Sequence, residues 1–154
     1  MTKIIIFDID GVLTDGTVQV DEKGHEYKSF LLNDIDALNQ LVRDGYAIAA
    51  ITGEDTPHVD YFYRKVPWKY FMRGCKNKLE AIKKIMANEK CLLDELAYIG
   101  DGLYDVPVLE YVSKSICPAN AVTAAKNVAR IHLHSFGGHG CVVELYEMIR
   151  NEQI

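Results

Sequence analysis

Residues 4–16 read IIIFDIDGVLTDG, an apolar run that ends abruptly on two aspartates and a glycine. The run from Ile4 to Phe7 is rich in β-branched residues and has no polar position, which is typical of a strand buried on both faces of a parallel sheet. Ligands of open α/β sheets bind at the carboxyl ends of the strands. We therefore expect Asp8 and Asp10 to lie in a ligand-binding crevice.

Short apolar runs and helical patterns alternate along the rest of the chain, which predicts a parallel sheet with helices on its faces. The expected strands lie at residues 46–51, 68–72, 96–99 and 115–117, with an extended segment at 130–133. The expected helices run from Asn33 to Gly45, onward from Thr56-Pro57, and over 76–87, 106–111, 122–129 and 141–151. Asn33 and Thr56 have short polar side chains, so we expect each to cap its helix.

A β-hairpin is expected soon after the first strand. Residues 17–20 and 25–28 flank the turn sequence Asp21-Glu22-Lys23-Gly24, in which Gly24 suits the turn. No repeat, linker or low-complexity tract divides the chain. We therefore predict one domain over residues 1–154, a doubly wound, Rossmann-like α/β fold with a small hairpin.

Composition excludes several classes of function. The chain has 154 residues, of which 49% are hydrophobic and 25% charged, and its net charge is 17 − 22 = −5. Such an acidic chain binds polyanions poorly, so we expect no nucleic-acid partner. No apolar stretch approaches the roughly 20 residues that a membrane-spanning helix needs, so we expect no membrane role. The first apolar run is too short for a signal peptide, and we expect a cytoplasmic protein.

The four cysteines show no C-x-x-C spacing and predict neither a zinc site nor a disulfide framework.

Carboxylates are the side chains that carry the clearest chemistry. Asp8 and Asp10 are two residues apart and followed by Gly11, an arrangement that suits a hard cation such as Mg²⁺. One carboxylate can act as a nucleophile and the other as a general acid and base. Asp101 and Asp105 follow the strand expected at 96–99 and either complete a metal site or cap a helix.

A hydroxyl, an open backbone N–H and a lysine provide groups that can hold an anion. Thr52-Gly53 ends the second expected strand, and Lys78 begins the helix after the third. Each signal alone has a simple structural explanation, as a helix cap or an exposed lysine. Their combined order is the informative feature: D-x-D, Thr-Gly, Lys and then G-D-x-x-x-D, each near a strand end.

The segments FDIDGVLTDG, ITGE, CKNK and YIGDGLYD match, in order, the four motifs of the haloacid dehalogenase superfamily of phosphohydrolases. This resemblance covers nearly the whole chain. The chain has no insert large enough for a cap domain, and it carries LTDG and a late GGHG. It therefore resembles the capless branch that contains the phosphatases of 3-deoxy-manno-octulosonate 8-phosphate and of 2-keto-3-deoxynononate 9-phosphate.

The resemblance implies a phosphoric monoester hydrolase and assigns roles to matching positions. Asp8 would be the nucleophile that forms an aspartyl-phosphate. Asp10 would protonate the leaving alcohol and then activate water. Thr52, the backbone of Gly53, and Lys78 would hold the phosphoryl oxygens, which is the positioning that phosphoryl transfer requires.

The resemblance also implies a Mg²⁺ cofactor. The ion would be held by the side chains of Asp8 and Asp101 and by the backbone carbonyl of Asp10, with Asp105 in support. Members of the superfamily commonly carry GDD where this chain has Gly100-Asp101-Gly102. Because Asp101 is the usual metal ligand, we expect metal binding to survive this departure.

Two more departures lie outside the metal site. The third motif often reads Asp-Lys, and here it is Asn77-Lys78. The tail motif usually reads GGxGAVRE, and here it is GGHGCVVE, so Val143 stands in place of the arginine.

Specificity is expected to depend on the residue that follows Thr52-Gly53. The octulosonate branch usually continues with arginine, whereas this chain has Glu54, as in the nononate branch. Lys65 lies eleven residues further on, about three helical turns, so it can share a helix face with Glu54. We therefore favour a nine-carbon 2-keto-3-deoxy sugar acid phosphate as the substrate, with Glu54 and Lys65 binding it, over the eight-carbon octulosonate phosphate.

The resemblance also implies a homotetramer, in which the hairpin at residues 16–30 and a neighbouring subunit cover the site. The aromatic run of Tyr61, Phe62, Tyr63 and Trp68 suits either such an interface or the core.

Two other classes of function compete with a phosphatase. A phospho-receiver domain has a similar fold, but its phosphorylated aspartate normally follows its acidic pair, whereas here D-x-D comes first. A weakly active or non-catalytic relative used for assembly is the second alternative, favoured by Gly102 and Val143 and opposed by the intact Asp8, Asp10 and Lys78.

Overall fold

The computed structural model describes residues 1–154 and contains a six-stranded, fully parallel sheet. The order of the strands is β5-β4-β1-β6-β7-β8. Their bounds are β1 (Ile4–Phe7), β4 (Ala47–Ile51), β5 (Tyr70–Met72), β6 (Leu96–Ile99), β7 (Lys114–Cys117) and β8 (Ile131–His132). The central strand β1 pairs with β4 on one side and β6 on the other, so the chain reverses its direction of winding beside β1. Ligand sites of such sheets lie at this reversal.

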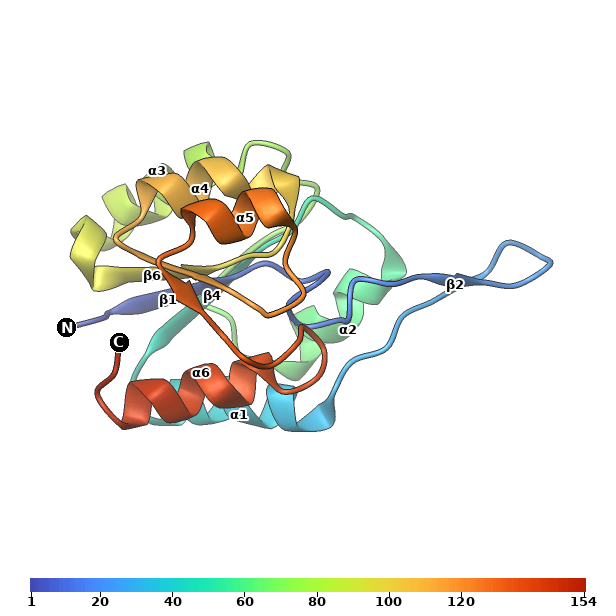
Figure 1. The fold of residues 1–154 in the computed structure, drawn as a ribbon, viewed down its shortest axis with the longest axis horizontal. Coiled ribbons are helices and arrows are strands. Elements are labelled where there is room, and N and C mark those ends of the chain that lie inside the picture. Colours follow the sequence, from blue (N-terminus) through green and yellow to red (C-terminus); the bar gives the residue numbers. More distant parts are fainter.

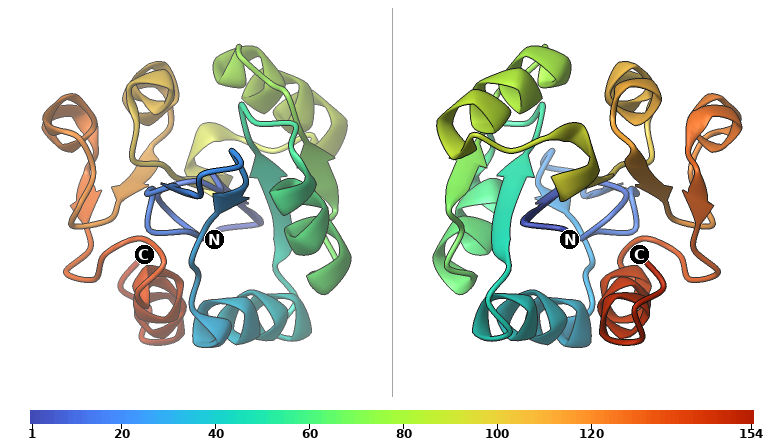
Figure 2. Two further views of the ribbon diagram at one scale, coloured as in Figure 1. Left: turned by 90° about the vertical axis from the view of Figure 1, so that its right-hand side faces the viewer. Right: turned by 90° about the vertical axis from the view of Figure 1, so that its left-hand side faces the viewer.

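Helices cover both faces of the sheet (Figures 1 and 2). One face packs against α1 (Leu32–Arg43), α2 (Pro57–Lys65) and α6 (Cys141–Arg150), and the other against α3 (Lys78–Glu89), α4 (Val106–Tyr111) and α5 (Thr123–Val128). The side chains of β1 alternate between the two resulting cores, with Ile5 and Phe7 in one and Ile4 and Ile6 in the other. Two short 3₁₀ helices, η1 (Leu93–Glu95) and η2 (Leu103–Asp105), flank β6.

The predicted fold class is therefore confirmed. No helix in the structure is both long enough and apolar enough to cross a membrane.

The expected hairpin is present and projects from the body of the molecule (Figure 1). Its strands, β2 (Gln19–Val20) and β3 (Glu26–Tyr27), are only two residues long each, and all four residues are exposed. A single antiparallel bridge between Thr14 and Phe30 closes its base. Because its tip packs against nothing, the ladder is shorter than the alternating sequence predicts.

Both predicted helix caps are wrong in detail. Helix α1 begins at Leu32 after Leu31, so Asn33 lies inside its first turn. Thr56 does precede α2, but its hydroxyl lies 3.4 Å from the ring nitrogen Nδ1 of His58 and caps no backbone N–H. Propensity places a short polar residue near a helix start, whereas neighbouring side chains decide where its hydroxyl or amide points.

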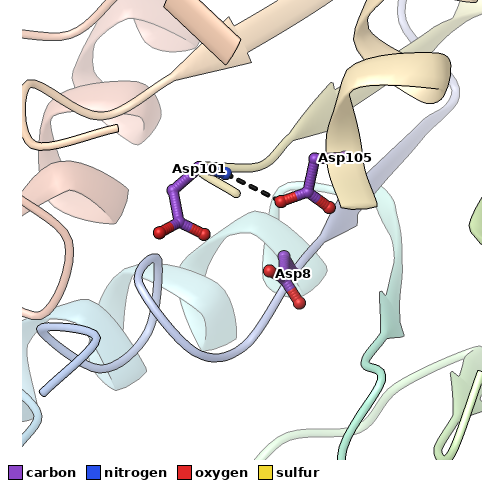
Figure 3. A group of neighbouring side chains, drawn as sticks. All are labelled: Asp8, Asp101 and Asp105. Atoms are coloured by element: carbon purple, nitrogen blue, oxygen red, sulfur yellow. Dashed lines mark hydrogen bonds between the residues drawn. The ribbon is translucent and has the colours of Figure 1, made fainter. Parts of the chain in front are cut away.

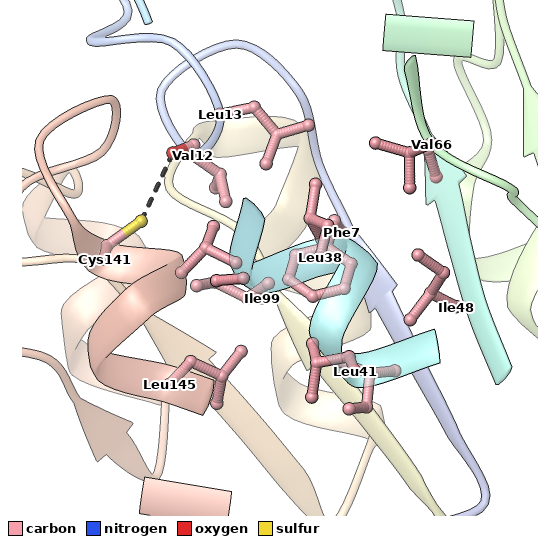
Figure 4. Close-up of a cluster of buried hydrophobic side chains, with 14 of the residues drawn as sticks. Phe7, Val12, Leu13, Leu38, Leu41, Ile48, Val66, Ile99, Cys141 and Leu145 are labelled. Atoms are coloured by element: carbon pink, nitrogen blue, oxygen red, sulfur yellow. Dashed lines mark hydrogen bonds between the residues drawn. The ribbon is translucent and has the colours of Figure 1, made fainter. Parts of the chain in front are cut away.

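Helices α1 and α6, which cover the same face of the sheet, are joined by hydrogen bonds. Asp34 of α1 is buried, and its carboxylate accepts hydrogen bonds from the backbone N–H groups of Gly140, Val142 and Val143. These are free donors at the start of α6, so Asp34 caps that helix from more than 100 residues away. Close by, the thiol of Cys141 donates to the carbonyl of Val12 at 3.2 Å (Figure 4).

Candidate active site

The loop after β1 is a tight turn that aims its carboxylates away from the sheet. The carbonyl of Ile9 accepts the backbone N–H groups of Val12, Leu13 and Thr14. Gly11 has a φ of +87°, and a Cβ there would lie 1.9 Å from Oδ2 of Asp101. Only glycine meets both demands, so Gly11 lets the Asp101 carboxylate come close to the loop.

The late GGHG motif, residues 137–140, packs against this loop although it lies near the other end of the sequence. A Cβ on Gly137 would lie 1.8 Å from the carbonyl oxygen of Gly11, so the two backbones are in direct contact. The N–H of Gly138 donates to the carbonyl of Val12 at 2.9 Å. The glycines of the motif are therefore needed for close contact with the loop after β1, which the spacing of the motif in the sequence does not reveal.

Three carboxylates gather at the ends of β1 and β6 (Figure 3). One oxygen from each of Asp8, Asp101 and Asp105 lies within 4.8 Å of the others. Lys78, the first residue of α3, has its Nζ 2.9 Å from Oδ1 of Asp8 and 2.7 Å from Oδ1 of Asp105. Sequence order alone predicts this meeting, and the structure brings these residues together.

Asp105 is saturated with hydrogen bonds and serves as a support. Its Oδ1 also accepts the hydroxyl of Tyr98 at 2.5 Å, and its Oδ2 accepts the backbone N–H groups of Asp101 and Gly102, both at 2.9 Å. By contrast, Oδ2 of Asp8 and the carboxylate of Asp101 accept no hydrogen bond from the chain. These free oxygens are the ones available to a ligand.

The cluster carries more negative charge than the chain neutralises. Burial and the neighbouring Asp105 raise the pKa of Asp8 well above its usual value, and the same two causes raise the pKa of Asp101 to about 7. Burial also acts on Asp105, but the charge and hydrogen bond of Lys78 keep its pKa below the usual value. The pKa of Lys78 is raised because the two carboxylates outweigh its burial. Three carboxylates therefore share one ammonium group, and free carboxylate oxygens are the ligands that Mg²⁺ prefers, so this donor set fits the ion.

An anion-binding corner lies beside the carboxylates, at the end of β4. Thr52 follows that strand, and the backbone N–H of Gly53 donates to no group of the chain. Nζ of Lys76 donates to the carbonyl of Gly53 at 3.0 Å and has no carboxylate partner. The corner and the acidic cluster open into one cavity of about 240 Å³. Its lining residues are Asp8, Asp10, Thr52, Gly53, Glu54, Cys75, Lys76, Lys78, Asp101, Gly102, Tyr104 and Asp105.

Asp10 lines the same cavity but is held from the hairpin side. Both of its carboxylate oxygens lie 3.0 Å from Nζ of Lys28, and Oδ1 also accepts the hydroxyl of Thr14 at 3.1 Å. Neither Lys28 nor Lys76 belongs to the site residues predicted from the sequence. No motif marks Lys28. Lys76 lies two residues before Lys78, and this short spacing indicates that it could reach the same site.

The predicted partnership of Glu54 with Lys65 is not formed. Helix α2 begins at Pro57, so Glu54 lies outside it and the two residues do not share a helix face. Glu54 lines the cavity, whereas Lys65 is exposed and places its ammonium group 5.4 Å from the centre of the Tyr61 ring. The prediction assumed a helix that continues back to residue 54, but the helix begins only at Pro57. Lys65 is therefore not brought to the cavity.

Known proteins share both the sequence pattern and this fold. The profile of the haloacid dehalogenase-like hydrolases matches residues 70–141. The 3-deoxy-D-manno-octulosonate 8-phosphate phosphatase of Haemophilus influenzae is 31% identical over 151 residues, which cover 98% of this chain and 84% of the relative. The chain belongs to the haloacid dehalogenase-like hydrolases. Its enzyme class within them is that of a phosphoric monoester hydrolase, as predicted.

Solved structures of haloacid dehalogenase-like hydrolases superimpose closely on this one. The 3-deoxy-D-manno-octulosonate 8-phosphate phosphatase of Moraxella catarrhalis, in complex with magnesium, phosphate and KDO, has a TM-score of 0.90 at 29% identity and covers 97% of this chain and 86% of its own. The cobalt-bound phosphatase of Haemophilus influenzae also has a TM-score of 0.90, at 31% identity, with 99% of this chain and 89% of its own covered. The capless architecture of this branch is thus shared along almost the whole chain.

Proposed function

We propose that this protein is a Mg²⁺-dependent phosphatase that hydrolyses a phosphorylated 2-keto-3-deoxy sugar acid through an aspartyl-phosphate. The contact that carries the proposal is the buried pair of Asp8 and Lys78 beside the free N–H of Gly53. A phosphoryl group in the cavity can meet the carboxylate of Asp8 and two donors, the ammonium group of Lys78 and the N–H of Gly53. The relatives named above, which are phosphatases of such a sugar acid, support the substrate class.

In the first step, a carboxylate oxygen of Asp8 attacks phosphorus, and the bond from phosphorus to the sugar oxygen breaks. Asp10 gives its proton to the leaving oxygen, so the sugar acid departs as a neutral alcohol group. The N–H of Gly53, Thr52 and Lys78 hold the phosphoryl oxygens during this transfer. Lys78 is fixed for this role because Asp105 holds it from behind at 2.7 Å.

In the second step, Asp10 takes a proton from water while the water oxygen attacks phosphorus. The bond between phosphorus and the Asp8 oxygen breaks, which releases phosphate and restores both carboxyl groups to their starting states. Asp10 is suited to both steps because it lines the cavity and stays 28% exposed, so water can reach it.

Asp8 and Asp101 would hold Mg²⁺ through their side chains, and Asp10 through its backbone carbonyl. When bound, the ion neutralises charge on the transferring phosphoryl group and on the carboxylates themselves. Asp105 would hold the loop that carries Asp101, through its hydrogen bond to the Asp101 N–H.

Replacement of the nucleophile tests the proposed mechanism. We expect Asp8→Asn to abolish turnover and leave the fold intact, because an amide has nearly the same shape but forms no acyl-phosphate. Asp10→Asn should lower turnover by roughly 10²–10⁴-fold and still bind Mg²⁺ in calorimetry, since its backbone carbonyl is unchanged. Turnover by Asp8→Asn near the parent rate would show that this aspartate is not the nucleophile.

Glu54 favours a nine-carbon acid over the eight-carbon octulosonate as the preferred substrate. It lines the cavity next to the anion-binding corner, where its charge repels phosphate but can accept hydrogen bonds from sugar hydroxyl groups. The octulosonate phosphate is the second candidate, favoured by the relatives. A phosphate-release assay on both sugar acid phosphates compares them directly.

Variants at Glu54 make this assay decisive for specificity. Glu54→Ala should change the ratio of kcat/KM between the preferred sugar acid and an aryl phosphate by about tenfold, the value of one hydrogen bond to a charged group. Glu54→Arg should move preference toward the octulosonate phosphate. Lys65→Ala is the matched control, because Lys65 lies away from the cavity, and it should leave the ratio unchanged. Equal losses on both substrates with Glu54→Ala would remove the argument for the nine-carbon acid.

We also infer that the chain assembles as a homotetramer through the hairpin. Val18, Val20 and Tyr27 are exposed large apolar side chains of the projecting hairpin, whose contact with α2 is a hydrogen bond between the ring of His58 and the carbonyl of Glu26. Large apolar side chains on a projecting hairpin are typical of a surface that a partner covers. Light scattering on the parent and on Val20→Lys tests this: we expect a tetramer in the first case and a smaller species in the second.

A further inference from the structure

We propose that Lys28, at the base of the hairpin, is the positioning residue for Asp10. This inference rests on the proposed function, in which Asp10 moves protons at the leaving oxygen. Nζ of Lys28 lies 3.0 Å from both oxygens of Asp10, and only 8% of the Lys28 side chain is exposed. A lysine held this deeply and bound to both carboxylate oxygens restricts how the Asp10 side chain can turn.

The base of the hairpin is built so that Lys28 reaches Asp10 across 18 residues of chain. Thr14 and Phe30 form the bridge that closes the hairpin, and Lys28 lies two residues before Phe30. Thr14 Oγ1 donates to Asp10 and accepts the backbone N–H groups of Gly11 and Gly16, so this hydroxyl is itself fixed. Asp10 is thus held by two donors, and both of them belong to the hairpin or its base.

Orientation matters more for Asp10 than for a residue that only supplies charge. A general acid must lie within hydrogen-bond reach of the oxygen that it protonates, and misplacement of a catalytic group by an ångström can lower the rate about 10²-fold. No helix or strand carries Asp10, which lies in a turn. Lys28 therefore provides the rigidity that regular secondary structure gives to Lys78.

The leaving group separates a positioning role from a merely structural one. An alkyl phosphate has a poor leaving group and needs the proton from Asp10, whereas the p-nitrophenolate ion leaves without one. The parameter kcat/KM reports only the steps up to alcohol release and excludes the later attack of water. Loss of orientation at Asp10 should therefore lower kcat/KM for an alkyl phosphate much more than for p-nitrophenyl phosphate.

The experiment compares Lys28→Met with the parent on glycerol phosphate and on p-nitrophenyl phosphate. We expect Lys28→Met to lower kcat/KM at least about tenfold on glycerol phosphate and less than about threefold on p-nitrophenyl phosphate, a fraction of what general acid catalysis contributes. Inhibition by inorganic phosphate should be unchanged, and Lys28→Arg should restore most of the loss. Lys23→Met, in the exposed turn of the same hairpin, is the control and should behave like the parent.

Equal losses on the two substrates, or no loss on either, would overturn the positioning role. If Lys28→Met does not fold, judged by its melting temperature, Lys28→Gln replaces it in the same comparison. Asp8→Asn, assayed in parallel, tests the proposed function separately. An inactive Asp8→Asn beside a fully active Lys28→Met removes only the role of Lys28, whereas an active Asp8→Asn removes the mechanism itself.

Discussion

Two lysine–aspartate contacts hold residues that line the cavity, and they are built differently. Lys78 and Asp105 are 4% and 1% exposed, and both belong to regular elements behind the sheet ends. Lys28 and Asp10 are 8% and 28% exposed, and both lie in loops at the base of the hairpin. The first contact is a buried part of the scaffold, whereas in the second contact the Asp10 carboxylate is open to water.

The difference indicates which groups the fold holds rigid and which it leaves free to act. Asp105 accepts hydrogen bonds from Lys78, Tyr98 and two backbone N–H groups, so it has no capacity left for a reactant. Asp10 accepts only from Lys28 and Thr14 and keeps one side toward the cavity. A saturated carboxylate supports the site, and a partly satisfied one can exchange a proton with a substrate.

Removal of each lysine should separate the two contacts most clearly. Lys78→Met should lower the free energy of unfolding by about 3 kcal/mol, because it leaves buried carboxylates without their counter-charge. Lys28→Met should cost about 1 kcal/mol, because water can reach Asp10. Urea unfolding followed by circular dichroism measures both. Lys84→Met, exposed on the same helix as Lys78, is the control and should stay within about 0.5 kcal/mol. If Lys78→Met and Lys28→Met lowered the free energy of unfolding equally, the two contacts would not differ in the way described.

Binding of Mg²⁺ to the cluster of Asp8, Asp101 and Asp105 should stabilise the folded chain. Three carboxylates share one ammonium group there, so a bound cation stabilises the folded chain. At a Mg²⁺ concentration of about one hundred times Kd, we expect a gain of about 2.7 kcal/mol in the free energy of unfolding. Thermal melts with and without Mg²⁺, at constant ionic strength, measure this gain. Asp101→Asn should remove this gain. Asp94→Asn, exposed and at the other end of β6 from Asp101, should keep it. A gain that survives in Asp101→Asn would place the ion elsewhere.

Tyr98→Phe is the smallest change that probes the support of Asp105. Burial and the nearby Asp105 raise the pKa of Tyr98 well above its usual value, so its hydroxyl stays protonated and donates at neutral pH. Loss of this hydrogen bond to a charged group should cost about 1.5 kcal/mol in urea unfolding. Tyr63→Phe, whose side chain is exposed, is the matched control and should show no change. A Tyr98→Phe variant as stable as the parent would mean that the other donors to Asp105 are sufficient.

The strands that carry the site, and the residues that follow them, could be predicted from the sequence. β1, β4 and β6 are continuous apolar runs, and the chemistry-bearing residues Asp8, Thr52 and Asp101 follow these strands within two positions. Because parallel strands end at one edge of a sheet, knowing the strands is enough to bring these residues together. Lys78 was predicted for the same reason, since it begins the helix that follows β5.

Only the tertiary structure decided the contacts that no local pattern encodes. Lys28 reaches Asp10 because a hairpin folds back, and Asp34 caps α6 because two helices far apart in sequence lie side by side. Lys65 does not line the cavity, and it shares no helix face with Glu54 because α2 begins only at Pro57, a boundary that helical spacing alone does not fix. Periodicity reports which face of an element is buried, over a few residues at a time. The direction in which a loop side chain points is set by whichever distant groups surround it, and that information is present only once the chain has folded.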